Sequence, residues 1–253
     1  MRAATMIKKI GVWIVVLAVW EGAYRTGVLS PMLFSAPSLV LKAAWTDGPA
    51  FVAALETTAF EIVVAIVLAW SVGVAFGTAA GAIPILARIS TPLLAAMIAV
   101  PFIIVYPVLT AWFGIGPESK IVFGTLLGVF PIALNTMIGV QAIEPGYVIM
   151  ARSMGASKLQ AMSQVMVPLA LPSVITGLRL GTSLIVIGVI LTEMLASTSG
   201  LGFLITYHRA MFDTGHVVLG ILLGLSTSYV ANALLSWIEQ RYGRWRSLQQ
   251  DMA

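Results

Sequence analysis

Charged side chains and cysteine are what this sequence has least of. Only 9% of its 253 residues are charged and none is cysteine, whereas a typical soluble domain has about 25% charged residues. So few charges cannot cover a globular surface in water, which argues against a soluble enzyme, a disordered chain or a disulfide-rich secreted module. The absence of cysteine also excludes thiol catalysis, disulfides and cysteine-bound zinc.

Long apolar stretches make up much of the chain. Hydrophobic residues make up 59% of the chain, and a helix needs roughly 20 apolar residues to cross a bilayer. Charge-free stretches of 26, 29, 23 and 25 residues occupy 62–87, 89–117, 121–143 and 214–238. Two further apolar stretches contain one acidic and one basic residue each, and none alternates with the period of a barrel strand. We therefore predict an all-α membrane protein, a single domain over 1–253, with six transmembrane helices at 10–29, 56–82, 92–115, 120–143, 173–197 and 216–238.

The distribution of positive charge predicts the orientation of these helices. Basic residues precede the first apolar stretch as in a signal peptide, but no Ala-x-Ala-like cleavage site follows, so we expect that span to be retained. With the N-terminus in the cytoplasm, nine basic residues lie inside, namely Arg2, Lys8, Lys9, Arg88, Arg152, Lys158, Arg241, Arg244 and Arg246. Four lie outside, namely Arg25, Lys42, Lys120 and Arg209. The asymmetry predicts a multi-pass membrane protein with both termini cytoplasmic, and it accounts for the net charge without a nucleic-acid partner.

Glycine spacing and turn residues predict how the helices pack and where they break. Glycines recur four residues apart within four spans, which favours close helix contacts; they are Gly73, Gly77 and Gly81, Gly124 and Gly128, Gly177 and Gly181, and Gly220 and Gly224. In the first outer loop, Ser38 is predicted to cap a short helix that ends before Asp47. Pro101 and Pro107 are predicted to interrupt the third span, either along a polar pathway or as a packing kink.

The longest predicted cytoplasmic loop, 144–172, is too long to be a simple connection. Its pattern predicts two short helices, 147–154 and 158–167, joined by a turn at Gly155, with Pro168 and Pro172 opening the next span. Apolar side chains fall on one side of the first helix, with Arg152 on the other. By itself such a segment is equally typical of a helix bound to the lipid surface.

The residues of this loop resemble a known motif. The run from Ala151 to Ser157, followed after nine residues from Gly155 by Val165-Met166-Val167-Pro168, is similar to the EAA motif of binding-protein-dependent ABC importer permeases. In that motif Glu-Ala-Ala is followed by three residues, Gly, nine residues and Ile-x-Leu-Pro. Ile149 and Met150 stand here in place of the Glu and the first Ala.

Further residues resemble the nitrate, sulfonate and taurine branch of those permeases, over about 51–242. They are Trp112-Phe113-Gly114-Ile115-Gly116, Ser119-Lys120-Ile121, Gly177-Leu178-Arg179-Leu180-Gly181, Glu193-Met194 and Ser199-Gly200-Leu201-Gly202-Phe203-Leu204-Ile205. Glu61 stands where relatives often carry Arg. The branch handles small oxyanions, and other relatives import pyrimidines or aromatic acids, so a small oxyanion or organic acid is the expected solute.

The resemblance implies a location in the bacterial inner membrane, the ABC importer type I permease fold and a coupling helix that docks into a cytoplasmic ATPase. The coupling residues would be Met150, Ala151, Arg152, Met154, Gly155, Ala156, Ser157 and Pro168. No Gly-Lys dipeptide occurs, so the chain has no phosphate-binding loop. The expected chain is thus not an enzyme and binds no cofactor, with ATP and Mg²⁺ held by a partner ATPase. Two ATPase subunits, a second permease copy forming a homodimer and an extracytoplasmic solute-binding protein complete the expected assembly.

Single polar residues within the spans are weaker candidates. Those considered for the pathway or its gate are Pro101, Tyr106, Trp112, Asn135, Thr192 and Glu193, although Glu193 is equally placed to bind loop amides. Arg179 is expected to reach the inner interface or to pair within the chain, and Glu61 to bond another helix end. His208 and His216, eight residues apart, are interpreted as solvated or interfacial rather than as metal ligands.

Two other functions remain open from sequence. An autonomous secondary carrier or channel would need intramembrane charges, which Glu61 and Glu193 could supply. An intramembrane serine protease is disfavoured because Ser199-Gly200 lacks the preceding glycine of the Gly-x-Ser-Gly signature.

Overall fold

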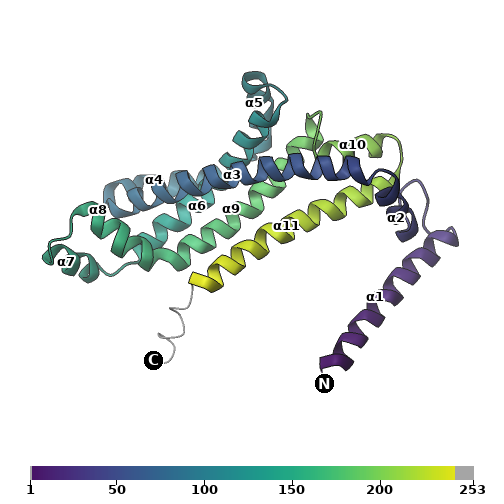
Figure 1. Ribbon diagram of the computed structural model, residues 1–253. Coiled ribbons are helices and arrows are strands. Elements are labelled where there is room, and N and C mark those ends of the chain that lie inside the picture. The colour runs from purple at the N-terminus through teal and green to yellow at the C-terminus, as the bar shows by residue number, and fades with distance from the viewer. Residues whose placement is uncertain (1, 243–253) are drawn as a thin grey trace. The chain divides into compact units, whose positions relative to one another are not determined.

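The computed structural model describes residues 2–242, and every regular element in that range is a helix (Figure 1). In chain order they are α1 (Arg2–Arg25), α2 (Pro37–Thr46), α3 (Gly48–Ala82), α4 (Pro84–Ala99), the 3₁₀ turn η1 (Phe102–Val105), α5 (Tyr106–Phe113), α6 (Pro117–Gln141), α7 (Pro145–Ser153), α8 (Lys158–Ala161), the π-helical turn η2 (Met162–Met166), α9 (Val167–Leu195), α10 (Leu201–Ala210) and α11 (Thr214–Tyr242). The predicted all-α membrane protein is confirmed at this level.

Four helices within the described residues are long and apolar enough to cross a membrane: Gly48–Ala82, Pro117–Gln141, Lys158–Leu195 and Thr214–Trp237. A bent pair, Pro84–Ala99 with Phe102–Phe113, makes a fifth candidate if it counts as one span. The predicted first span, 10–29, overlaps α1, but the helix ends at Arg25 and gives way to a turn. The count of six spans therefore stays a prediction.

The predicted third span is not one continuous helix. α4 ends at Ala99, and the chain bends by 82° before η1 and α5. Val100 is extended (φ −71°, ψ 132°) because the ring of Pro101 disfavours helical geometry in the residue before it. Pro107 lies in the first turn of α5, where its missing N–H leaves no hydrogen bond unmade. The predicted interruption is thus confirmed, and its main cause is Pro101.

The described residues divide into two compact units, each formed by two stretches of chain: 2–58 with 193–226, and 59–192 with 227–242. In the second unit, the latter part of α3 lies beside α4 and α6 (Figure 1). A Cβ added at Gly77 would lie 2.5 Å from the carbonyl oxygen of Ala133 on α6, so only glycine allows this approach of two backbones. Gly181 on α9 likewise faces Ile132 of α6. The predicted glycine contacts between helices are confirmed at these positions.

The first unit joins α1 and α2 to the start of α3 and to α10. Trp20 donates its indole N–H to the carbonyl of Ser35 at 2.8 Å, and Ser38 donates its hydroxyl to Glu21 at 2.8 Å. The prediction that Ser38 caps α2 was wrong: the N-cap is Ala36, without a side-chain bond, because Pro37 in the first turn begins the helix two residues earlier. Phe51, Ala54 and Leu201 form the buried core of this unit.

Candidate functional site: an exposed elbow and buried polar clusters

The segment between α6 and α9 forms a bent elbow. α7 covers Pro145–Ser153, and the chain turns at Gly155, whose φ of +91° is a left-handed conformation that strongly favours glycine. The N–H of Ala156 bonds the carbonyl of Ala151, and that of Gly155 bonds the carbonyl of Arg152, which together form a Schellman turn. The predicted first helix and glycine turn are therefore observed, with the helix starting two residues earlier.

The second arm of the elbow begins with a reciprocal cap. The hydroxyl of Ser157 accepts the backbone N–H of Gln160 at 3.2 Å, and the Gln160 side chain accepts the N–H of Ser157 at 2.8 Å. α8 then lasts a single turn, and η2 carries the chain into α9, where Pro168 has no N–H to donate. The predicted regular helix over 158–167 was wrong, since its second half winds as a π-helix. Such turns are frequent at functional sites.

The elbow presents apolar side chains to its surroundings. Met150 is 60% exposed and Met154 82% exposed, and Ile149 and Leu159 are exposed as well. Methionine adapts its shape to a partner surface. Both ends of the elbow are held in the second unit, because Val140 of α6 packs against Ala170 and Val174 of α9. The elbow therefore combines exposed apolar side chains with ends that are fixed by two packed helices.

A cavity of about 560 Å³ lies against the second arm of the elbow. Met162 and Ser163 of η2 line it together with Trp70 and Thr78 of α3. The indole N–H of Trp70 bonds the hydroxyl of Thr182 on α9 at 3.1 Å. A displacement of η2 would therefore change the shape of this space, which is an open groove on the surface of the second unit.

Glu193, a candidate for the gate, is bonded to the start of α10. Its side chain is 1% exposed; Oε1 accepts the hydroxyl of Thr58 at 2.7 Å and Oε2 accepts the N–H of Gly202 at 2.8 Å. The hydroxyl of Thr58 in turn accepts the N–H of Leu201 at 2.8 Å. A helix N-terminus leaves free N–H groups that attract a carboxylate. Glu193 thus holds α10 in place, and a role as a gate stays a prediction.

The other pathway candidates do not converge. Tyr106 and Thr192 are buried, Trp112 is 74% exposed, and Pro101 lies at the bend after α4. Tyr106 packs edge-to-face on Phe123 at 5.5 Å. Asn135 donates its amide to the carbonyl of Pro131 in its own helix. None of these contacts identifies a pathway, so these roles also stay predictions.

Lys120 and Glu61 form a buried ion pair between α6 and α3. Lys120, counted among the outer charges, is 1% exposed, and its ammonium lies 2.5 Å from the carboxylate of Glu61, which is fully buried. Its partner charge lies on α3, within reach of the start of α6. Arg179, in contrast, pairs within the chain as one of its two predicted alternatives, with Glu239 on α11.

His208 and His216 were expected to be solvated or interfacial; both side chains are partly buried, with 16% and 13% of their surface exposed. Their rings stack at 4.3 Å, and Phe51 stacks on both. Burial lowers the pKa of His208, and the charge of His216 lowers it further, against the opposite effects of Asp213 and Asp47. The eight-residue spacing gave no signal of this contact, because a turn rather than a helix brings the two rings together.

The long apolar helices define a multi-span membrane protein, in which the elbow joins α6 to α9. The family profile described as binding-protein-dependent transport system inner membrane component matches residues 72–244, and the chain belongs to this family. It is an inner-membrane permease component of ABC importers, as the sequence predicted.

Individual relatives agree with this assignment. The chain is 30% identical over 243 residues to the taurine transport system permease protein TauC of Escherichia coli (strain K12), covering 93% of this chain and 88% of that protein. It is 26% identical over 236 residues to the putative aliphatic sulfonates transport permease protein SsuC of Bacillus subtilis (strain 168), covering 92% and 85%. An inward-facing structure of the MetNI methionine ABC transporter has the same fold, with a TM-score of 0.60, 20% identity, and coverage of 75% of this chain and 96% of that chain.

Proposed function

We propose that the elbow formed by α7, Gly155 and α8 is the coupling segment through which a separate ATPase drives solute import. The exposed Met150 and Met154 on a fixed base are the observation that carries this proposal. They would enter a groove on the ATPase as a helix does in helix-in-groove recognition, with Arg152 at the rim. Ala156, Ser157 and Pro168 shape the second arm, and ATP and Mg²⁺ would be bound by the ATPase rather than by this chain.

The groove beside η2 connects the elbow to α3. Motion of the elbow would be transmitted through Met162 and Ser163 to the space they share with α3. A solute moves only if the two states bind it differently, so coupling requires that motion of the elbow change the shape of the permease, as it would at this groove. Two permease copies as a homodimer, two ATPase subunits and an extracytoplasmic binding protein complete the proposed assembly.

The proposed solute is a small sulfonate such as taurine, or a related oxyanion. The support is that relatives are named as permeases for taurine and for aliphatic sulfonates. A nitrate permease is also 27% identical over 181 residues. The buried carboxylates support a partner-driven rather than an ion-coupled carrier. Glu61 is neutralised by Lys120, and Glu193 by hydroxyl and amide donors.

The test is a Gly155→Val variant of the full complex reconstituted in liposomes with its binding protein. Val at a φ of +91° is strained, although the space around Gly155 is open, so the change deforms the turn without a clash. We expect the chain to insert normally and ATP-driven uptake of taurine or an aliphatic sulfonate to fall at least tenfold. Co-purification of the ATPase subunit provides a second measurement.

Gly27→Val is the matched control. Gly27 also has a positive φ, of +77°, and open space around it, but it lies in the turn after α1. Its uptake should remain within twofold of the unmodified protein. Equal uptake by the Gly155 and Gly27 variants would contradict the coupling role, and stimulation of ATP hydrolysis only by solutes without a sulfonate or other oxyanion group would contradict the proposed substrate class.

A further inference from the structure

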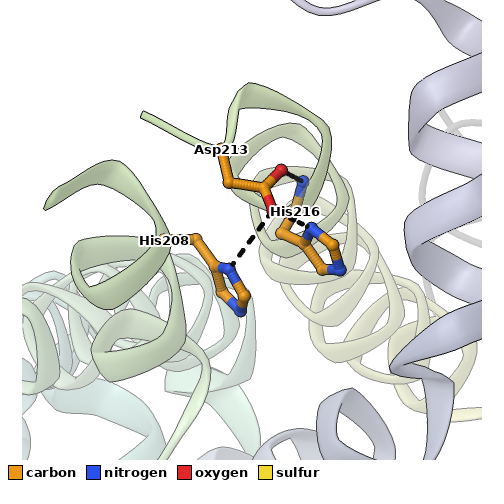
Figure 2. Close-up of side chains that lie close together, drawn as sticks. All are labelled: His208, Asp213 and His216. Carbon is orange, nitrogen blue, oxygen red and sulfur yellow. Dashed lines mark hydrogen bonds and ion pairs between the residues drawn. The ribbon is translucent and has the colours of Figure 1, made fainter. Parts of the chain in front are cut away.

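The turn between α10 and α11 brings together two imidazoles and a carboxylate. Figure 2 shows His208, Asp213 and His216 pointing toward one another, and one ligand atom of each lies within 4.8 Å of the others. Oδ2 of Asp213 is 2.7 Å from Nδ1 of His216 and 3.9 Å from Nδ1 of His208. The two rings are 16% and 13% exposed, so the group is shielded from water without being sealed.

A strained backbone maintains this arrangement. Asp213 donates its N–H to the carbonyl of His208, and Phe212 donates to that of Arg209, which makes a Schellman turn at the end of α10. Phe212 takes the position usually filled by glycine, with a φ of +56°. A bulky residue in this conformation is strained, and such strain points to a constraint on function. The turn that Phe212 makes places Asp213 against both histidines.

The charges in the cluster are unbalanced in a way that favours a cation. Nε2 of His216 lies 2.8 Å from Oδ2 of Asp47, a partner for the ring N–H. With its proton on Nε2, the neutral ring directs a lone pair from Nδ1 toward the Asp213 carboxylate. Nδ1 is buried and has no hydrogen bond of acceptable geometry despite the short distance. Two electron-rich atoms in such contact repel each other unless a positive charge lies beside them.

We propose that Nδ1 of His208, Nδ1 of His216 and the carboxylate of Asp213 bind a divalent transition-metal ion of the Zn²⁺ type. Two imidazoles and one carboxylate are a common zinc ligand set that leaves a fourth position for water. Asp47 then orients His216 from its far nitrogen, the arrangement usual for metal-bound histidines. Mg²⁺ and Ca²⁺ fit less well, because they prefer oxygen ligands throughout.

The geometry requires only local adjustment. Ligand atoms around a tetrahedral zinc ion are about 3.3–3.6 Å apart, and the two measured separations of 2.7 and 3.9 Å fall on either side of that value. The stacked rings are parallel to within 9°, so both lone pairs cannot meet at one ion until one ring turns. His208 is the ring to turn, because the contact with Asp47 fixes His216. Metal binding therefore separates the stacked pair.

A cavity of about 340 Å³ gives an ion a path to the cluster. Asp213 and His216 form part of its wall, with Tyr24, Lys42 and Thr46 among the others. A polar cavity of this size also holds the water that would complete the coordination sphere. The site and the cavity lie within one compact unit, so the path depends on no arrangement between units.

The experiment uses the full-length chain in detergent, purified with a tag that contains no histidine and freed of metal by a chelator. Calorimetric titration with Zn²⁺ should give one ion per chain. His208→Ala and Asp213→Asn should each weaken binding at least tenfold, and Asp47→Asn, acting through His216, by about 10–100-fold. Asp213→Asn keeps a good helix cap for α11, so the variant is expected to fold.

A control and a spectroscopic measurement make the outcome decisive. Glu118→Gln removes an exposed carboxylate outside the cluster and should bind zinc as the unmodified protein does. Co²⁺ should give the intense visible absorption of a tetrahedral site, and His208→Ala should abolish it. Absence of zinc binding by the folded chain, or equal binding by all four variants, would overturn the proposal and leave His216 as a protonated bridge between two aspartates.

Discussion

At the scale of single residues, the most consequential pair is Glu61 and Lys120. Both side chains are almost completely buried and lie 2.5 Å apart. Each residue stands directly beside a charge-free stretch, and sequence alone does not reveal that one meets the other. An isolated charge in hydrocarbon is costly, so the pair is stable only as a pair.

Removing one member of this pair should destabilise the protein strongly. We expect Glu61→Gln or Lys120→Met to lower the free energy of unfolding by about 3–5 kcal/mol, because each leaves an unpaired buried charge. The double variant Glu61→Leu with Lys120→Met removes both charges and should recover most of the loss. Unfolding in detergent measures the effect, and a double variant no more stable than the weaker single variant would show that the charges do not act as a pair.

At the scale of elements, glycines determine how closely α3 and α6 approach. Gly73, Gly77 and Gly81 form one face of α3, and a Cβ at any of them would lie within 3 Å of an atom on α6. The regular spacing in the sequence predicted this face correctly. It did not predict which helix would lie against it, because a glycine face is compatible with any neighbour that offers a close backbone.

Gly77→Ala should therefore disrupt the contact between α3 and α6. The added methyl group would lie 2.5 Å from a backbone carbonyl oxygen, which cannot move aside as a side chain can. We expect a loss of about 1–3 kcal/mol in unfolding free energy, typical of an overpacked contact. Gly22→Ala, with no atom nearby, is the control and should be neutral or slightly stabilising, since alanine favours the helix. Equal stability of the two variants would contradict the close contact.

At the scale of the whole molecule, orientation in the membrane is the property to establish first. The chain has no cysteine, so a single introduced cysteine reports the side on which it lies. We expect Met154→Cys to react with a membrane-impermeant thiol reagent only from the cytoplasmic face, and Thr198→Cys only from the opposite face. Both residues are exposed. The reverse pattern of labelling would contradict the proposed topology and, with it, the coupling role of the elbow.

The sequence predicted most of the fold because its strongest signals are long apolar stretches and well-placed turn residues. The helices α3, α6, α9 and α11 and the turn at Gly155 follow from such local patterns. The histidine cluster could not be predicted, since it depends on Phe212 adopting a left-handed conformation against its own preference. Asp47, the carboxylate that contacts His216, is also 169 residues away from it in the sequence, so only the folded chain brings it to the cluster.

The buried ion pair also affects how the protein is made. α3 leaves the ribosome first, carrying Glu61, and its counter-charge follows only when α6 has been synthesised. Until then the growing chain must keep that carboxylate protonated, hydrated or within the insertion machinery, because lipid offers no counter-ion. Membrane insertion of α3 is therefore completed only after α6 has also been inserted.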